Sequence, residues 1–350
     1  SLYINPAGLV SSDLTWEKAS TFNIGLDFTM LNQRLDFSFD WYQRTTSDML
    51  VKVEYPEVLG TTAPPANKAE LRTRGWEVSV KWNDRIGNDF SYDLGFILSD
   101  SQAEITKYEN PSGTLSDYYV GQKIGEIWGY ETEGFYQSDT DVQNHADQSK
   151  LGANWAPGDI MYKDLDGNKK INNGSNTLDD HGDLKVIGNT TPRYQYGITA
   201  NMSYKNVYLN VFFQGIGKRD FWPSSQPFWP VATQYYNTQK WFVTDSWSED
   251  NRDAYFARPI ARETKNQQKQ TKYLQDASYC RLKNLTVGYD FPKSWLSFLH
   301  VAKAGVYFSA ENLFEFTNVK GAYDPEAAGK NGTMVYPFQR TYSFGLNVTF

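Results

Sequence analysis

The residues with the clearest chemical potential lie in one acidic stretch, DLDGNKKINNGSNTLDDHGD, from Asp164 to Asp183. Asp164, Asp166 and Asn168 occupy positions 1, 3 and 5 of an EF-hand-like calcium loop, in which side-chain oxygens coordinate the ion. Lys170 falls at position 7, which contributes a backbone carbonyl, and hard oxygen ligands of this kind favour Ca²⁺ over Zn²⁺. The stretch therefore predicts a structural calcium site that stiffens a loop.

The same stretch departs from the calcium-loop pattern at two positions. Lys169 stands where the pattern has glycine, and Ser175 stands at the twelfth position, where an acid closes the site. We interpret the run GSNTLDDHG as an insertion. An acidic, solvated loop that is held by Asx turns and binds no ion also accounts for these residues.

The sequence contains none of the common catalytic motifs. It has three histidines, His145, His181 and His300, and it lacks the G-x-S-x-G, H-E-x-x-H and Walker A patterns. His181 lies beside two aspartates, but we expect it to be solvated rather than a general base. A glycoside hydrolase would need two of the 41 acidic residues, and no pair stands out. We expect no enzymatic activity and propose no catalytic residues.

A second candidate site is the aromatic run RDFWPSSQPFWPVATQYYNTQKWFVTDSW. Five of its rings are candidate contacts for a ligand or a partner: Trp222, Trp229, Tyr235, Tyr236 and Trp241. Aromatic faces beside amides suit sugar rings and peptide side chains, since both combine apolar patches with polar edges. Alternatively, the rings only pack their loop against its surroundings.

Composition excludes several other classes of protein. A formal net charge of -7 argues against nucleic acid, because phosphate recognition needs a basic patch. Cys280 is the single cysteine, so no internal disulfide forms. The sequence contains no run of about 18 apolar residues, so we predict no transmembrane helix. The opening SLYINPAGLVSSDLTWEK has no signal-peptide pattern, and we expect it to start within a longer protein.

Alternation of apolar and polar residues indicates the elements that must position these loops. In TFNIGLDFTM, RLDFSFDW, GWEVSVKW and RYQYGITANMSY every second residue is apolar, as in a strand with one apolar face. The closing segment RTYSFGLNVTF continues the pattern to Phe350. We predict about nine antiparallel strands, at residues 20–31, 33–50, 69–83, 89–105, 191–204, 206–217, 276–290, 302–312 and 340–350.

Strand length and polarity favour a membrane barrel over a soluble sandwich. Sandwich strands average five or six residues, whereas these extend to ten or more. Asp27, Asp36, Asp40 and Glu77 would be unpaired charges in a sandwich core but are acceptable in a water-filled lumen. Short connections also alternate with long ones, as in outer-membrane barrels with short periplasmic turns and long extracellular loops. We predict extracellular loops at residues 106–189 and 218–275.

Seven blocks in order give the chain a family resemblance. WEKASTFNIGLDF, IGEIWGYETEGFYQ, PGDIMYKDLDGN, IGNTTPRYQYGITANMSYKNVYLNVFFQG, SYCRLKNLTVGYDFP, ENLFEFTNVKGAYDPE and YPFQRTYSFGLNVTF together resemble the C-terminal part of SusC/RagA-type TonB-linked transporters of Bacteroidota. The resemblance implies an all-β fold, the C-terminal portion of a 22-stranded outer-membrane barrel with a plugged lumen. It also places Asp183 at the acid position that closes the calcium site, with Asp179 and Asp180 as competitors.

The resemblance further implies partners that lie outside this chain. We expect a second polypeptide to supply the plug and the remaining strands, because open sheet edges are not tolerated in lipid. We also expect contact with TonB through that missing N-terminal part, and a SusD-like lipoprotein over the extracellular mouth. The predicted function is import of oligomeric nutrients, oligosaccharides first and oligopeptides as the alternative. A secreted, β-rich glycan-binding or adhesion protein is the other alternative, and it would not need detergent.

Overall fold

A single antiparallel sheet dominates the structure, a computed structural model that describes residues 14–52, 64–224, 228–231, 237–297, 301–321, 323–328 and 338–350. Nine long strands follow one another in the order β1-β2-β3-β4-β9-β10-β13-β14-β16. Their bounds are β1 (Lys18–Met30), β2 (Leu35–Val51), β3 (Ala66–Ile86), β4 (Phe90–Lys107), β9 (Arg193–Tyr204), β10 (Val207–Lys218), β13 (Tyr279–Asp290), β14 (Lys303–Glu311) and β16 (Thr341–Thr349). The nine predicted strands are therefore confirmed, with end points that differ by a few residues.

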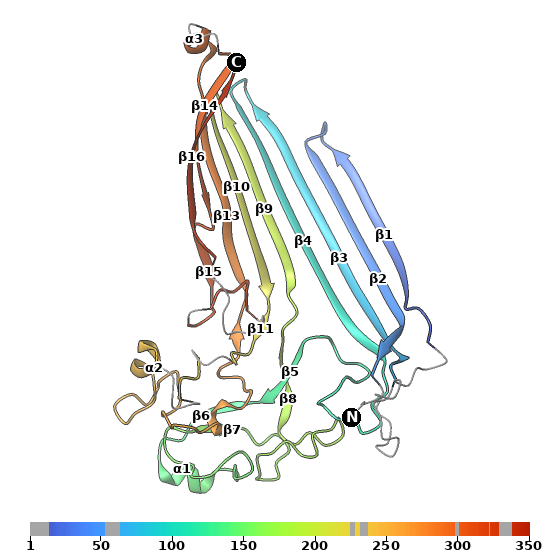
Figure 1. Ribbon diagram of the computed structural model, residues 1–350, viewed down its shortest axis with the longest axis vertical. Coiled ribbons are helices and arrows are strands. Elements are labelled where there is room, and N and C mark those ends of the chain that lie inside the picture. The colour runs from blue at the N-terminus through green and yellow to red at the C-terminus, as the bar shows by residue number, and fades with distance from the viewer. Residues whose placement is uncertain are drawn as a thin grey trace, which may run out of the picture.

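Short turns join the strands at one end of the sheet. Residues 31–34 join β1 to β2, residues 87–89 join β3 to β4, and residues 205–206 join β9 to β10. Figure 1 shows these turns at the top, near α3 (Lys293–Leu296) and the C-terminus, while the long connections lie at the opposite end. The predicted alternation of short and long connections is present in the described residues.

Register gives the sheet one apolar and one polar face. Directly paired residues share a face, and successive residues alternate between faces. One rung crosses all nine strands with apolar or aromatic residues: Met30, Leu35, Trp82, Leu94, Ala200, Val211, Leu285, Ala310 and Tyr342. The adjacent rung on the other face is mainly polar: Thr29, Asp36, Lys81, Gly95, Thr199, Phe212, Asn284, Glu311 and Thr341.

The apolar face is open across the sheet. The side chains of Phe22 and Phe344 are 59% and 83% exposed, and Ile24, Leu94 and Val306 are also exposed. A contiguous apolar surface of this extent marks an interaction with another apolar phase or partner. Among the described residues, no helix has the length and hydropathy of a membrane-spanning segment.

The sheet is irregular beside β13. β14 pairs with residues 284–290 of that strand, whereas the short β15 (Glu315–Thr317) pairs with residues 279–281. Asn312 adopts φ 51 between the two, and Leu282 donates its backbone N–H to the Phe314 carbonyl at 3.0 Å. β15 was not predicted, because the left-handed residue at 312 interrupts the alternation that identified β14.

Two long connections carry short elements of their own. Residues 108–192 contain β5 (Glu126–Tyr130), β6 (Thr132–Phe135), α1 (Asp139–Asn144), β7 (Ile160–Tyr162) and β8 (Leu184–Asn189). The described residues of 219–278 contain β11 (Asp220–Phe221), α2 (Lys240–Thr244), η2 (Lys265–Gln267) and β12 (Gln275–Asp276). β5 pairs with β8, β6 with β7, and β11 with β12. None of these short elements was predicted from the sequence.

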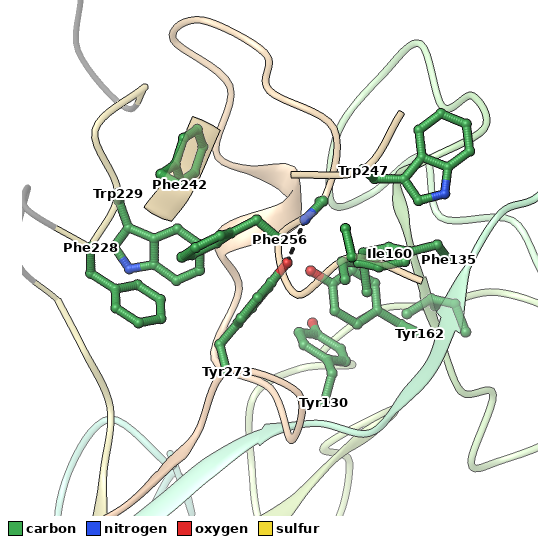
Figure 2. Close-up of a cluster of buried hydrophobic side chains, with 13 residues drawn as sticks. Tyr130, Phe135, Ile160, Tyr162, Phe228, Trp229, Phe242, Trp247, Phe256 and Tyr273 are labelled. Carbon is green, nitrogen blue, oxygen red and sulfur yellow. Dashed lines mark hydrogen bonds between the residues drawn. The ribbon is translucent and has the colours of Figure 1, made fainter. Parts of the chain in front are cut away.

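The two connections share one aromatic core, and we call them together the loop module. Its buried members come from both connections: Tyr130, Phe135, Ile160, Tyr162, Ile171, Phe228, Trp229, Phe242, Trp247, Ala254, Phe256, Ala257 and Tyr273. Figure 2 shows rings from the two connections facing one another around Phe256 and Tyr273. The Tyr273 hydroxyl accepts a hydrogen bond of 2.7 Å from the Ala257 backbone N–H. Much of the chain's buried apolar surface therefore lies in the loop module.

Candidate functional site

A buried ionic cluster joins the two connections of the loop module. Asp159 is fully buried and accepts hydrogen bonds of 2.9 Å from both Nε and Nη2 of Arg258. Lys265, also buried, lies 2.9 Å from the second oxygen of Asp159, and Asn266 Nδ2 donates to the first at 2.9 Å. Since Asp159 belongs to one connection and its three partners to the other, the cluster fixes their relative position.

The partners of Asp159 also determine its protonation. Burial by itself raises the pKa of this carboxyl, but hydrogen bonds from Arg258, Asn266 and Lys265 outweigh it and hold the pKa below its ordinary value. Asp159 therefore remains ionised in the folded module at neutral pH. Lys265 completes the cluster by donating to the carbonyls of Ala153 and Asn154 at 2.9 and 2.8 Å.

Within this module, the acidic stretch brings three carboxylates together. One oxygen each from Asp164, Asp166 and Asp183 lies within 4.8 Å of the others. Asp183 is fully buried, whereas Asp166 is exposed. Like charges at this separation repel one another, and a bound cation would relieve that repulsion.

Backbone N–H groups orient two of these carboxylates. Asp164 accepts from Gly167 and Lys169 at 2.8 Å each. Asp183 accepts from Leu165 at 2.7 Å and from Asn172 at 2.9 Å, one bond to each oxygen. Because every carboxylate oxygen has two lone pairs, these bonds leave acceptor capacity for an ion. The carboxylates are thus held in place by the chain itself.

The pKa of Asp183 reflects its crowded surroundings. Burial raises the pKa above its ordinary value, and the charges of Asp166 and Asp164 add to this effect. The backbone hydrogen bonds from Asn172 and Leu165 act in the opposite direction and only partly offset it. The ionised form of Asp183 is therefore the costly one when no cation is present.

The other predicted ligands lie in the same loop. Asn168 Nδ2 donates to Asp166 at 2.8 Å, and its Oδ1 accepts from the Lys170 backbone N–H at 2.7 Å. The Lys170 carbonyl accepts from Asn172 Nδ2 at 3.2 Å. Ile171, which follows, is fully buried in the aromatic core. The atoms that could coordinate a metal ion are all oxygens, so this set of ligands suits a hard cation such as Ca²⁺ and not Zn²⁺.

The two other acids of the insertion, Asp179 and Asp180, do not join the three carboxylates. Asp180 accepts from the Ser175 hydroxyl at 2.6 Å, and Asp179 is exposed. Asp183, rather than either of these, lies beside Asp164 and Asp166. His181, expected to be solvated, is half-buried: its ring centroid lies 5.4 Å from that of Trp128, and its Nδ1 is buried without a hydrogen-bond partner among the described residues. The indole of Trp128 shields one side of the imidazole, a tertiary contact that the sequence does not indicate.

The aromatic candidates lie at different depths in the loop module. Trp229 is 8% exposed and belongs to the buried core, while Trp222 and Trp241 are partly buried against it. Tyr235 and Tyr236 lie outside the described residues. Packing of the rings against their own module accounts for the surroundings of Trp229. Contact with a ligand or partner stays a prediction, for which Trp222 and Trp241 retain exposed surface.

An antiparallel sheet with one apolar and one polar face, topped by a loop module, defines the wall of a membrane β-barrel. Residues 1–313 match the family described as TonB dependent receptor-like, beta-barrel. The chain therefore belongs to the TonB-dependent receptors, a family of outer-membrane proteins and not of enzymes.

Two similar proteins from other bacteria support the same assignment. The chain is 30% identical over 366 residues to TonB-dependent receptor P3 of Formosa agariphila, covering 97% of this chain and 35% of that protein. It is 27% identical over 355 residues to TonB-dependent receptor SusC of Bacteroides thetaiotaomicron, covering 97% and 32%. The chain thus spans about a third of the length of the curated relatives it matches.

Solved structures of a peptide importer share the fold. The RagAB peptide transporter matches with a TM-score of 0.73 and 25% identity, covering 100% of this chain and 38% of that one. The RagAB peptide importer in its open-open state matches with a TM-score of 0.75 and 25% identity, covering 99% and 37%. The resemblance to SusC and RagA is therefore confirmed, and the fold is that of a C-terminal portion of such a barrel.

Proposed function

We propose that this chain forms the C-terminal part of the barrel of a SusC-type transporter that actively imports oligomeric nutrients. The observation that supports this most strongly is the pair of nine-residue rungs, one apolar and one mainly polar, which suits a wall between lipid and an aqueous lumen. No catalytic step is part of the proposal.

The transporter would need further polypeptide around this chain. Within the described residues, β1 and β16 each pair on one side only, so both present an open edge. Backbone groups on such edges cost several kcal/mol each in hydrocarbon. A second polypeptide would pair with these edges and supply the plug that contacts TonB. A SusD-like lipoprotein would sit over the loop module, on the extracellular side.

Two substrate classes are proposed for the transporter. Oligosaccharides come first, because Trp222 and Trp241 offer partly exposed aromatic faces in the loop module. Oligopeptides are the second candidate, and they are favoured by the likeness to the RagAB peptide importer.

Bound Ca²⁺ would stabilise the loop module in this transporter. Asp164, Asp166, Asn168 and Asp183 would supply side-chain oxygens, and Lys170 would supply its carbonyl. Experimental density for the ion is expected at about 2.3 to 2.6 Å from these oxygens. A well-ordered loop with the same side chains turned into solvent and no ion would contradict this part of the proposal.

Uptake by the producing bacterium tests the transport function. We expect a strain that lacks the gene to stop depleting one class of labelled oligomer from the medium, and a plasmid copy to restore depletion. Loss for oligosaccharides with unchanged uptake of peptides would select the first substrate class, and the reverse would select the second. Isolation of this chain alone as a soluble, cooperatively unfolding monomer without detergent would instead favour the secreted glycan-binding alternative.

A further inference from the structure

Two lysines converge on one tyrosine at the edge of the loop module. Lys320 Nζ lies 4.0 Å from the ring centroid of Tyr255, and Lys272 Nζ lies 5.9 Å from the same centroid. Lys272 Nζ also lies 4.4 Å from the ring centroid of Phe135. Aromatic rings attract ammonium groups through their negative faces, so both ammonium groups are held near the ring of Tyr255.

Buried groups fix the geometry of this pair. Gln275 is 4% exposed, and its Nε2 donates to the Tyr255 hydroxyl at 2.7 Å. Its Oε1 accepts from the backbone N–H of Lys320 at 2.9 Å. The ring of Trp241 is stacked on that of Tyr255, with centroids 6.1 Å apart. The buried amide of Gln275 therefore binds both the Tyr255 hydroxyl and the backbone of Lys320.

Neither lysine forms an ion pair with a described carboxylate, although Asp253 and Asp245 lie near enough to act on the charge of Lys272. One of these carboxylates is already engaged, since Asp245 Oδ1 accepts from the Tyr255 backbone N–H at 3.0 Å. Burial lowers the pKa of Lys272 and the charge of Lys320 adds to the lowering, while the charges of Asp253 and Asp245 partly oppose it. Two ammonium groups that repel each other beside aromatic rings are suited to accept an anion.

We infer that Lys272, Lys320 and the ring of Tyr255 form a binding site for an anionic group, a carboxylate or a sulfate, on the imported oligomer. The inference rests on the proposed import function, and it makes acidic oligomers the preferred substrates. The anionic oxygens would accept charge-assisted hydrogen bonds from both ammonium groups. The partly exposed ring of Trp241 would provide an apolar face for the adjoining sugar ring or peptide side chain.

Amine labelling of the purified, complete transporter tests the site without requiring transport. Surface amines are acetylated briefly, with and without added sodium sulfate or sodium acetate at matched ionic strength, and each lysine is quantified by mass spectrometry. We expect sulfate, acetate or both to slow the labelling of Lys272 and Lys320 severalfold. Lys150, an exposed lysine of the same module, should label equally fast in every condition. The salt that protects more strongly identifies the preferred anion.

Variants then test whether the two lysines act together. Lys320→Gln should remove the anion's protection of Lys272, whereas Lys150→Gln should not. Lys272→Gln should weaken binding of an acidic oligomer, oligogalacturonate or a sulfated oligosaccharide, by about tenfold or more, since hydrogen bonds to charged groups are strong. Binding of a neutral oligosaccharide of equal length should be unchanged.

Three outcomes would overturn the site. The first is equal labelling of Lys272 with and without either anion, and the second is equal protection of Lys150. The third is protection of Lys272 and Lys320 by added SusD-like lipoprotein but by neither anion. The last result would assign the lysines to a protein interface instead. Because labelling is independent of uptake, equal uptake of every oligomer by the parent strain and the strain that lacks the gene would count against the proposed function and leave the anion site standing.

Discussion

The ring of Tyr208 lies over Gly288 on the neighbouring strand, so closely that a Cβ added to this glycine would be 2.1 Å from Tyr208 Cζ. The same relationship recurs between Tyr307 and Gly345, where an added Cβ would be 2.2 Å from the ring. Register places all four residues on one rung of the polar face, in the order Tyr208, Gly288, Tyr307, Gly345. Tyrosines and glycines thus alternate across four strands, each ring filling the space that a glycine leaves.

Substitution Gly288→Ala should reduce the amount of folded barrel. The added methyl group would collide with Tyr208, and overpacking of this kind costs about 1 to 3 kcal/mol. The measurement is the heat-modifiable fraction on gels, from outer membranes of cells that make the protein. The double variant Gly288→Ala, Tyr208→Ala should recover part of the loss, because removal of the ring makes room for the methyl group. No recovery would show that the ring is not the cause.

Arginine scanning of β10 should distinguish the two faces of the sheet. Val211 belongs to the apolar rung that crosses all nine strands, whereas Asn210 pairs with Asn201 on the polar face. A cation on a lipid-facing side costs about 2 to 4 kcal/mol at the bilayer midplane. Val211→Arg should therefore impair barrel assembly far more than Asn210→Arg. Equal loss of folded barrel in both variants would refute the assignment of lipid and lumen.

The strands could be predicted from the sequence because their signal is local. In β1 and β16, alternation directly encodes which face each side chain takes, and short turns mark where strands reverse. The loop module could not be predicted, because its core and ion pairs join distant segments. Asp159 and Arg258, for example, are 99 residues apart in the chain. Nothing next to either residue in the sequence indicates that they meet.

The acidic loop falls between these two cases. The spacing of Asp164 and Asp166 is visible in the sequence, but the distance of Asp183 along the chain is not typical of a calcium loop, and only the family pattern pointed to it. The lysines around Tyr255 were not identified at all, because Lys272 and Lys320 come from different connections of the sheet. A site assembled by tertiary contacts leaves no periodic or short-range signal.

Substitution Asp159→Asn should loosen the loop module without unfolding the sheet. It leaves Arg258 and Lys265 without the carboxylate that neutralises them, and breaking a buried ion pair costs about 3 to 5 kcal/mol. We expect faster proteolysis within residues 108–192 and 219–278, with unchanged heat modifiability of the barrel. Asp250→Asn, at an exposed position, is the matched control. Equal protease resistance of the Asp159 and Asp250 variants would exclude the cluster as the link between the connections.

The Asp159 cluster also predicts an acid limit for the module. A carboxyl whose pKa is lowered in the folded state stabilises that state above its unfolded pKa. The contribution is lost as pH falls from the ordinary aspartate range through the lowered folded value. Protease resistance of the module should decrease in that range in the unaltered protein, and less so in Asp159→Asn, which has already lost the interaction. A larger acid effect in the variant would contradict the assignment.

Calcium binding should depend on pH through Asp183, in a direction that its surroundings determine. In the ion-free loop, burial and the neighbouring charges raise the pKa of this carboxyl, so folded protein binds a proton more readily than unfolded chain does. The ionised carboxyl then destabilises the ion-free module as pH rises through the raised value. Calcium requires the ionised form, so binding releases a proton there. As pH falls through the raised pKa of Asp183, the ion-free module should become more stable and calcium binding should become weaker. Both changes should begin at a higher pH than for an ordinary aspartate.

Calorimetric titration of the complete, chelator-treated protein with CaCl₂ at several pH values measures this coupling. Asp183→Asn should abolish the additional pH dependence and weaken binding severely, because it removes the buried anionic ligand. Asp179→Asn removes the same charge from an exposed position of the same insertion and should leave affinity nearly unchanged. Lys170→Ala should also bind normally, since only its backbone carbonyl is expected to contact the ion. If Asp179→Asn weakened binding as much as Asp183→Asn, general electrostatic attraction of the acidic stretch would explain the result, and a defined site would not.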